Sequence, residues 1–260
     1  MKLAFTPADF ALIGVVTAMA TAMAYVHSPR AKSVVFCLPL PFTAAVISSG
    51  QSVDLTHLVG LLLVLLFPWL VWLLHVRMRV NIFVADLIGV GAFLALGFLF
   101  ARLLPRGGQE REALLFAGGC VVLTVLSAAG LLLPPRIEPG HRSALPVYFK
   151  VPAVVAVVTG IILIKEPLRG FMPFFPFATI FAVYESRHSL HTLASRMPIM
   201  GLGSVPFLAI VRALQPEHGY AWALGAAWAC YVPLALLLDQ YYARRAVDGV
   251  DLVDAVDKRG

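Results

Sequence analysis

The sequence predicts an all-α fold, a polytopic bundle of transmembrane helices with almost no soluble part. Two observations support this prediction. The 260 residues are 60% hydrophobic and only 13% charged, whereas ordinary soluble chains are about 25% charged. The apolar residues also fall into runs of about 18 to 23, the length that a helix needs to cross the hydrocarbon core of a bilayer. A soluble chain of this size could not bury so much apolar surface.

About nine apolar membrane segments are expected, joined by short connectors that carry much of the charge and proline. They are residues 8–26, 33–50, 57–76, 82–103, 113–134, 147–164, 171–185, 197–213 and 219–239. No connector is long enough to separate soluble domains. The first run follows Lys2 but has no clear cleavage site, so we interpret it as a retained span rather than a signal peptide.

A two-fold internal repeat is predicted from two proline-interrupted segments. The second segment contains Pro39 and Pro41, and the seventh contains Pro173 and Pro176; in both, a Pro-Phe pair is followed by small residues. Pro41 and Pro176 are 135 positions apart (176 minus 41). The same offset places the first, third and fourth segments on or near the sixth, eighth and ninth. Chance resemblance between apolar helices is the competing explanation.

This repeat divides the chain into four parts. They are a first four-segment repeat (1–104), a linker transmembrane helix (105–140), a second four-segment repeat (141–242) and an acidic tail (243–260). If all four segments of a repeat span the membrane, four spans plus the linker make an odd number, and the second half is inverted relative to the first. If the broken segment only dips into the membrane, three spans plus the linker make an even number, and the halves are parallel. We favour the inverted form. The tail repeats Val and Asp every three residues, a period that drifts around an α-helix. We interpret it as solvated, with a docking segment for a partner as the alternative.

The distribution of basic residues predicts the orientation. The formal net charge is +6, and no stretch interleaves Lys and Arg with aromatic residues in the way that nucleic-acid binding requires. Twelve basic residues fall on one side and seven on the other, with Lys150 left out: Arg30, Lys32, Arg77, Arg79, Arg136, Arg142, Arg187, Arg196, Arg244, Arg245, Lys258 and Arg259 against Lys2, Arg102, Arg106, Arg111, Lys165, Arg169 and Arg212. The positive-inside rule then places the C-terminus in the cytoplasm and the N-terminus outside, in a bacterial-type inner membrane.

The two broken segments are the predicted substrate pathway. Proline removes a backbone donor and frees the carbonyl of the preceding turn, and such groups must face protein, water or a ligand because lipid cannot satisfy them. Paired broken helices at matching positions are typical of transporters. The alternative is that these prolines only kink helices for packing. The residues assigned to the pathway are Pro41, Thr43, Ser48, Ser49, Pro176, Thr179 and Tyr184.

Ionisable residues within apolar segments are candidates for ion coupling, because they are costly in a membrane. Glu185, His188, His191 and Asp86 form this group. If the seventh helix continued beyond Glu185, then Glu185 and His188 would share one face and could relay protons. The alternative is that the stretch from Glu185 onward is only the solvent-exposed cytoplasmic end of a membrane span. Lys150 and Arg187 favour a small anion as the substrate.

The sequence indicates no enzyme class through a motif: the chain has no GxSxG, HExxH, P-loop or GxGxxG pattern. Asp54 and His57 together with the HxxH pair would be a weak metal site, so we expect no metal and no cofactor. The glycine pairs Gly89/Gly91, Gly118/Gly119 and Gly201/Gly203 predict close helix packing.

The favoured function is therefore a transporter or channel for a small solute, with proton coupling. A membrane-embedded enzyme that acts on a lipid through its Glu/His cluster and a structural subunit of a membrane complex are the alternatives. Expected partners are membrane lipids, a small-molecule or ion substrate, and a second copy of the chain or another protein at the acidic tail.

Overall fold

The computed structural model describes residues 6–26, 28, 31, 34, 35, 37–105, 110–132, 138, 147–163 and 168–257. Every regular element among these residues is helical. The elements are α1 (Pro7–Tyr25), α3 (Leu40–Ser49), α4 (Leu55–Trp72), η1 (Leu73–Arg77), α5 (Ile82–Leu103), α6 (Glu110–Leu131), α7 (Val147–Ile162), η2 (Arg169–Phe174), α9 (Phe177–Glu185), α10 (Leu190–Ala194) and α11 (Met197–Asp257).

Four of the described helices are long and apolar enough to cross a membrane. They cover Leu55–Arg77, Ile82–Leu103, Glu110–Leu131 and Leu190–Arg245. Large apolar side chains on their outer faces are exposed, such as Leu87 at 72% on α5 and Leu114 at 74% on α6. Outward apolar faces of this kind are what a bilayer covers.

Local sequence signals explain where several helices begin. Thr6 and Asp9 form a capping box at the start of α1, and Asp54 and His57 form another at the start of α4. In both, the side chains satisfy backbone amides that have no partner within the helix. Asn81 caps α5, because its side chain accepts from the backbone N–H of Phe83 at 2.9 Å.

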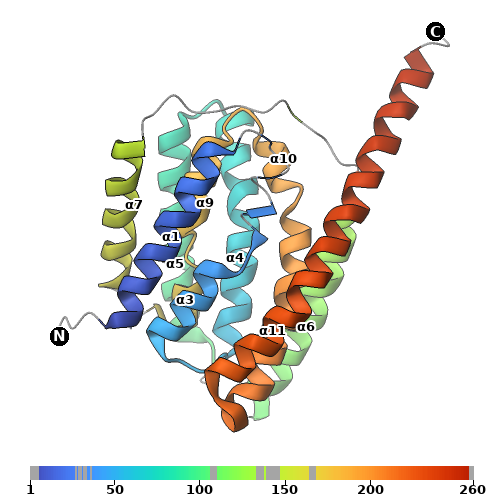
Figure 1. The fold of residues 1–260 in the computed structure, drawn as a ribbon. Coiled ribbons are helices and arrows are strands. Elements are labelled where there is room, and N and C mark those ends of the chain that lie inside the picture. Colours follow the sequence, from blue (N-terminus) through green and yellow to red (C-terminus); the bar gives the residue numbers. More distant parts are fainter. Residues whose placement is uncertain are drawn as a thin grey trace.

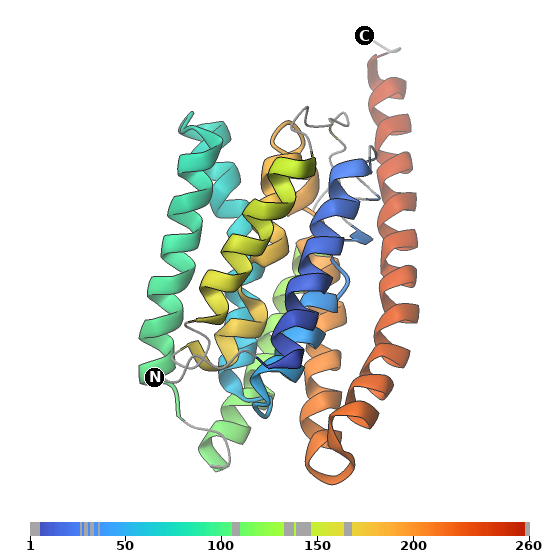
Figure 2. The same ribbon diagram turned by 60° about the vertical axis from the view of Figure 1, so that its left-hand side comes forward.

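The helices stand side by side around α4, which packs against α5, α6, α10 and α11 (Figure 1). On the other side of the bundle, α1 packs against α3, α7 and α9. The last part of α11 extends beyond the rest of the bundle (Figure 2).

The two proline-interrupted segments run in opposite directions. α3 begins after Pro39 and leads from the middle of the bundle to its lower end, whereas α9 begins after Pro176 and leads to the upper end (Figure 1). The 3₁₀-helical turn η2 precedes α9 and packs against α3 and α4. Both helix starts therefore lie at the middle of the bundle.

The C-terminal part of the chain has two helical arms, as expected for residues 197–213 and 219–239, but it lacks the expected connector between them. Residues 214–218 are helical, and the first arm (197–218) and the second arm (220–257) of α11 meet at Gly219, where φ is +73° and ψ is 174°. Glycine alone adopts this conformation readily, so the chain reverses there without a separate loop. The backbone then stays helical to Asp257, which includes most of the predicted tail; the tail side chains from residue 246 lie outside the described part.

The prediction of close packing at glycines is confirmed at four positions. A Cβ atom would lie 2.9 Å from Phe67 at Gly89 and 3.1 Å from Leu58 at Gly119, and it would clash with Ser127 at Gly201 and with Tyr231 at Gly203. The prediction is wrong for Gly91 and Gly118, which have open space around them. In these pairs, one glycine faces a neighbouring helix and the other does not.

Candidate functional site

The two proline-interrupted segments meet at one small internal cavity of about 40 Å³. Leu38, Pro39, Pro41 and Phe42 line it from the first segment, and Pro173, Phe174, Phe175, Ala178 and Thr179 line it from the second. The first arm of α11 supplies the remaining polar group, Ser204. The rings of Phe42 and Phe174 lie 4.7 Å apart and join the two segments.

Both half-helices present their N-termini to this cavity. Neither Pro39 before α3 nor Pro176 before α9 provides a side-chain cap. The first helical hydrogen bonds run from Thr43 N to Pro39 O (2.9 Å) and from Ile180 N to Pro176 O (3.0 Å). The amides that precede these bonds have no acceptor within their own helix. The cavity therefore combines the positive ends of two helix dipoles.

The predicted pathway residues divide between this cavity and other places. Pro41 and Thr179 line the cavity. Thr43 lies one turn into α3, where its hydroxyl donates to Pro39 O at 2.8 Å and accepts from Trp228 Nε1 at 3.0 Å. Ser48 and Ser49 are at the far end of α3: the Ser48 hydroxyl donates to Asp9, and the Ser49 hydroxyl donates to Val46 O. Neither serine lines the central cavity.

A second and larger cavity of about 250 Å³ lies between α1, α5, α7 and α9. Two predicted ion-coupling residues, Asp86 and Glu185, line it together, and so does Tyr184. Asp86 lies just after the first turn of α5 and Glu185 is the last residue of α9, so the cavity is near the upper end of the bundle (Figure 1). The side chains of Asp86 and Glu185 are buried, with residue exposures of 9% and 2%.

The helix that contains Glu185 does not continue to the two histidines that were predicted with it. α9 ends at Glu185, because the chain turns at residues 186–189. His188 is therefore exposed in the turn, and His191 packs edge-on against Trp69 and Trp72, at 5.6 and 5.8 Å between ring centroids. The condition for a shared face of Glu185 and His188, a helix that continues beyond Glu185, is therefore not met.

The basic residues predicted to attract an anion do not line the central cavity. The Arg187 guanidinium donates to Tyr184 O at 3.3 Å and lies 5.0 Å from the Tyr184 ring. The side chain of Lys150 is outside the part of the chain that the structure describes.

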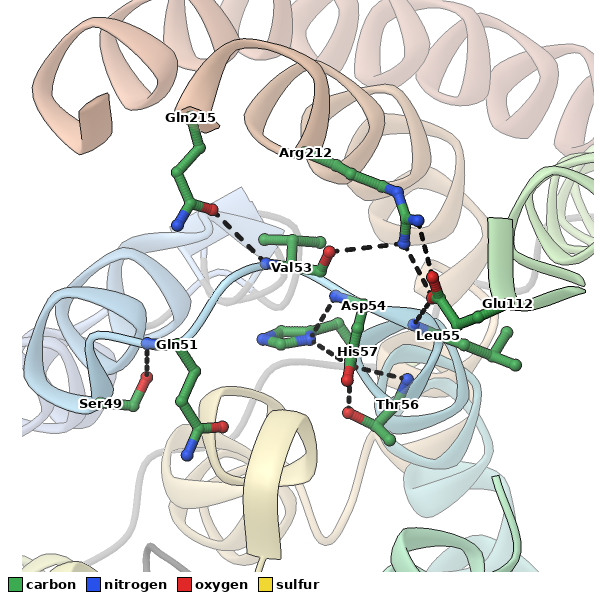
Figure 3. Close-up of polar contacts among 10 residues, drawn as sticks. All are labelled: Ser49, Gln51, Val53, Asp54, Leu55, Thr56, His57, Glu112, Arg212 and Gln215. Atoms are coloured by element: carbon green, nitrogen blue, oxygen red, sulfur yellow. Dashed lines mark hydrogen bonds and ion pairs between the residues drawn. The ribbon is translucent and has the colours of Figure 1, made fainter. Parts of the chain in front are cut away.

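Sequence reasoning missed a buried polar network, drawn in Figure 3. It lies where α4 begins, at the lower end of the bundle in Figure 1. The Glu112 side chain has no exposed surface and accepts from Arg212 through two bonds of 2.8 and 2.7 Å. Glu112 also accepts the backbone N–H of Leu55 at 2.7 Å, and Arg212 donates to Val53 O. The network joins α6, α11 and the start of α4. Glu112 and Arg212 are 100 positions apart, so no local spacing could have revealed the pair.

His57 lies beside this network. Its Nδ1 atom is 3.1 Å from both the backbone nitrogen and Oδ1 of Asp54. Its Nε2 atom is buried and has no hydrogen-bond partner among the described residues, and Figure 3 shows this nitrogen turned away from Asp54. A metal needs several ligands, and no group of three His, Cys, Asp or Glu side chains in the described part of the chain is placed to hold one.

A second, partly buried ion pair joins Arg196, the residue before α11, to Asp239 on the second arm of α11 at 2.5 Å. Arg196 also lies over the ring of Tyr242 at 4.9 Å, and the Tyr242 hydroxyl donates to Ser195 at 2.9 Å. The first arm of α11 is thus held by an ion pair near each of its ends.

The fold and its apolar helices define an α-helical integral membrane protein. No protein-family model matches this chain, and no curated protein or solved structure shows significant similarity to it. Its function therefore has to be inferred from its own residues.

Proposed function

We propose that the protein is a membrane transporter or channel for a small solute, with the solute held between the two proline-interrupted segments. One observation carries this proposal. Two segments that are far apart in the sequence each break at proline, and both breaks line the same internal cavity. Broken helices with termini at mid-depth are the usual way in which membrane proteins hold a polar solute.

The chemistry of the central cavity favours a small anion. Its polar lining consists of helix N-termini and the hydroxyls of Thr179 and Ser204, whose residues are 2% and 3% exposed. Amide N–H groups at helix N-termini attract negative charge. A volume of about 40 Å³ accommodates one ion of a few atoms. Support for an anion thus comes from the backbone, rather than from Lys150 and Arg187.

The opposite directions of α3 and α9 support the inverted repeat with α6 as its linker. In this proposal, nine segments cross or enter the membrane, and the start of α1 and the end of α11 face opposite sides. The basic residues near the upper end of the bundle, including Arg77, Arg79, Arg244 and Arg245, would face the cytoplasm of a bacterial-type cell. Asp86 and Glu185 would supply the ion-coupling site, because buried carboxylates exchange protons or cations.

Flux into proteoliposomes tests the proposal. The purified protein should accelerate the movement of small anions such as chloride, nitrate or formate across the bilayer. Thr179→Val removes one cavity hydroxyl and should reduce this flux several-fold. Thr124→Val is the matched control, because the Thr124 hydroxyl is exposed and donates only to Cys120 O of its own helix; its flux should be unchanged.

Accessibility of single cysteines distinguishes a pathway from a one-sided site. In a cysteine-free background, Thr179→Cys and Ser204→Cys should react with thiol reagents added from either side of the membrane. Reaction from one side only, together with no anion flux, would contradict transport.

A membrane-embedded enzyme is the second candidate. It is favoured by the position of Asp86 and Glu185 at helix ends near one face, where a lipid substrate could reach them. It is disfavoured by the separate placement of His188 and His191. A structural subunit would instead depend on the tail, so removal of residues 246–260 would disturb assembly while Glu185→Gln would not.

A further inference from the structure

The cavity that contains Asp86 and Glu185 has a composition that differs from that of the central cavity. It is about six times larger, about 250 Å³ against 40 Å³. Its other lining side chains are apolar or aromatic, apart from Thr21 and the Tyr184 hydroxyl. A bare proton needs no such space, so the cavity has room for a ligand with a carbon skeleton.

The state of the Asp86 carboxylate indicates that this ligand carries a positive charge. The residue is 9% exposed, and its Oδ1 atom is buried without a hydrogen-bond partner among the described residues. A buried carboxylate oxygen without a partner is unfavourable. The second carboxylate, Glu185, lines the same cavity. A cation that enters the cavity would compensate the Asp86 charge.

The lining favours an organic cation over a metal ion. Ca²⁺ and Mg²⁺ take six or more oxygen ligands at short distance, whereas this cavity has two carboxylates on different helices among apolar walls. Three aromatic residues, Phe83, Phe181 and Tyr184, line it as well, and the rings of Phe83 and Tyr184 are paired at 5.0 Å. Aromatic faces together with carboxylates are the usual environment of alkylammonium groups.

We propose that the cavity between α1, α5, α7 and α9 binds a monovalent organic ammonium group, with Asp86 as its main counter-ion and Phe83 and Phe181 as aromatic walls. The ammonium can belong to a free small molecule or to the headgroup of a membrane lipid. This site does not depend on the proposed anion pathway, since binding is measured without transport. Loss of flux with binding intact would overturn the transport proposal alone.

The binding of choline to the purified protein in detergent tests this proposal. Choline should bind and raise the thermal unfolding temperature. Its neutral isostere, 3,3-dimethylbutan-1-ol, should not do so at the same concentration. Asp86→Asn should weaken choline binding at least tenfold, because the charge-assisted contact is lost. Phe83→Leu should weaken it about two- to fivefold; Phe83 is 62% exposed, so this change leaves the fold intact.

Glu217→Gln is the matched charge control. Glu217 is 79% exposed in its side chain and does not line the cavity, so choline should bind this variant as it binds the wild type. The lipid arm uses nanodiscs of phosphatidylcholine or phosphatidylglycerol. Retention of phosphatidylcholine by the wild type but not by Asp86→Asn, without binding of free choline, would assign the ammonium group to a lipid headgroup.

Two results would overturn the site. The first is equal binding of choline and its neutral isostere, which would leave only an apolar cavity. The second is unchanged choline and lipid binding in both Asp86→Asn and Phe83→Leu, which would place any bound cation elsewhere.

Discussion

Removal of the Arg212 charge should destabilise the protein strongly. Arg212→Met keeps an apolar chain of similar length but leaves the Glu112 carboxylate, which has no exposed surface, without its cation. Two of the three hydrogen bonds that Glu112 accepts disappear. Breaking a buried ion pair by removing one partner costs about 3 to 5 kcal/mol.

The lower end of that range is the expected result for Arg212→Met. The Leu55 N–H still donates to Glu112, and the N-terminus of α4 favours a nearby negative charge. The Arg212 side chain is also one-quarter exposed. Water therefore still reaches part of its charge, and loss of this pair should cost less than loss of a fully buried pair. We therefore expect a loss of about 3 kcal/mol in the free energy of unfolding.

Unfolding by sodium dodecyl sulfate in mixed micelles, followed by circular dichroism, measures this change. The double variant Glu112→Leu/Arg212→Met should be more stable than Arg212→Met alone, because it contains no buried unpaired charge. Glu217→Gln serves as the exposed control and should change stability by less than about 0.5 kcal/mol. A loss below about 1 kcal/mol in the unfolding free energy of Arg212→Met would refute the reasoning, because a buried carboxylate left without its cation should destabilise the fold by more than that.

Three further substitutions test other contacts by the same unfolding measurement. Gly170→Ala would place a Cβ atom against the side chains of the α4 capping box and should cost about 1 to 3 kcal/mol; Gly225→Ala, with open space around it, should be neutral or stabilising, and equal effects would contradict the packing. Gly219→Ala should cost about 1 to 3 kcal/mol, because only glycine adopts φ +73° and ψ 174° without strain. No loss of stability would mean that the reversal of the chain between the two arms of α11 does not need this conformation. Trp228→Phe removes the bond to the Thr43 hydroxyl and should cost about 1 kcal/mol, a loss that should disappear when Thr43→Val is already present.

The helical class and the special position of the two proline pairs could be predicted from the sequence. Both depend on local signals, namely long apolar runs and residues that cannot continue a helix. The same local signals explain why Pro41 and Thr179 are found at the central cavity while Ser48 and Ser49 are not. Proline marks where a helix starts, but hydroxyls further along the helix have moved away from that point by its rise.

Long-range polar contacts could not be predicted. Glu112 lies in a charged stretch at the start of an apolar run, which is the pattern of an exposed loop end. Arg212 was counted only as a basic residue outside the membrane. Their pairing depends on how α6 packs against α11, and this packing follows from side-chain shape rather than from periodicity. His191 shows the converse, because its contacts with Trp69 and Trp72 withdraw it from the cluster that its spacing suggested.

The positions of the ion pairs indicate which wall of the central cavity is fixed. The first arm of α11 lines the cavity at its middle, and it is held by Arg196–Asp239 near one end and by Arg212–Glu112 near the other. Moving this arm relative to α6 would break a pair at a cost of about 3 kcal/mol or more. The opposite wall, formed by the starts of α3 and α9, contacts this arm mainly through apolar and aromatic side chains. Such contacts can slide at lower cost than an ion pair can break. Two hydrogen bonds also join this wall to the second arm of α11, from Trp228 to Thr43 and from Tyr231 to Cys37 O, and each costs about 1 kcal/mol to break. Access to the cavity should therefore come from movement of α3 and α9 against a stationary α4–α6–α11 unit. A disulfide that links α6 to α11 should therefore leave anion flux intact. A disulfide that links the start of α3 to the first arm of α11, where the rings of Phe42 and Phe207 lie 5.6 Å apart, should abolish the flux, and the reverse result would assign the movement to α11.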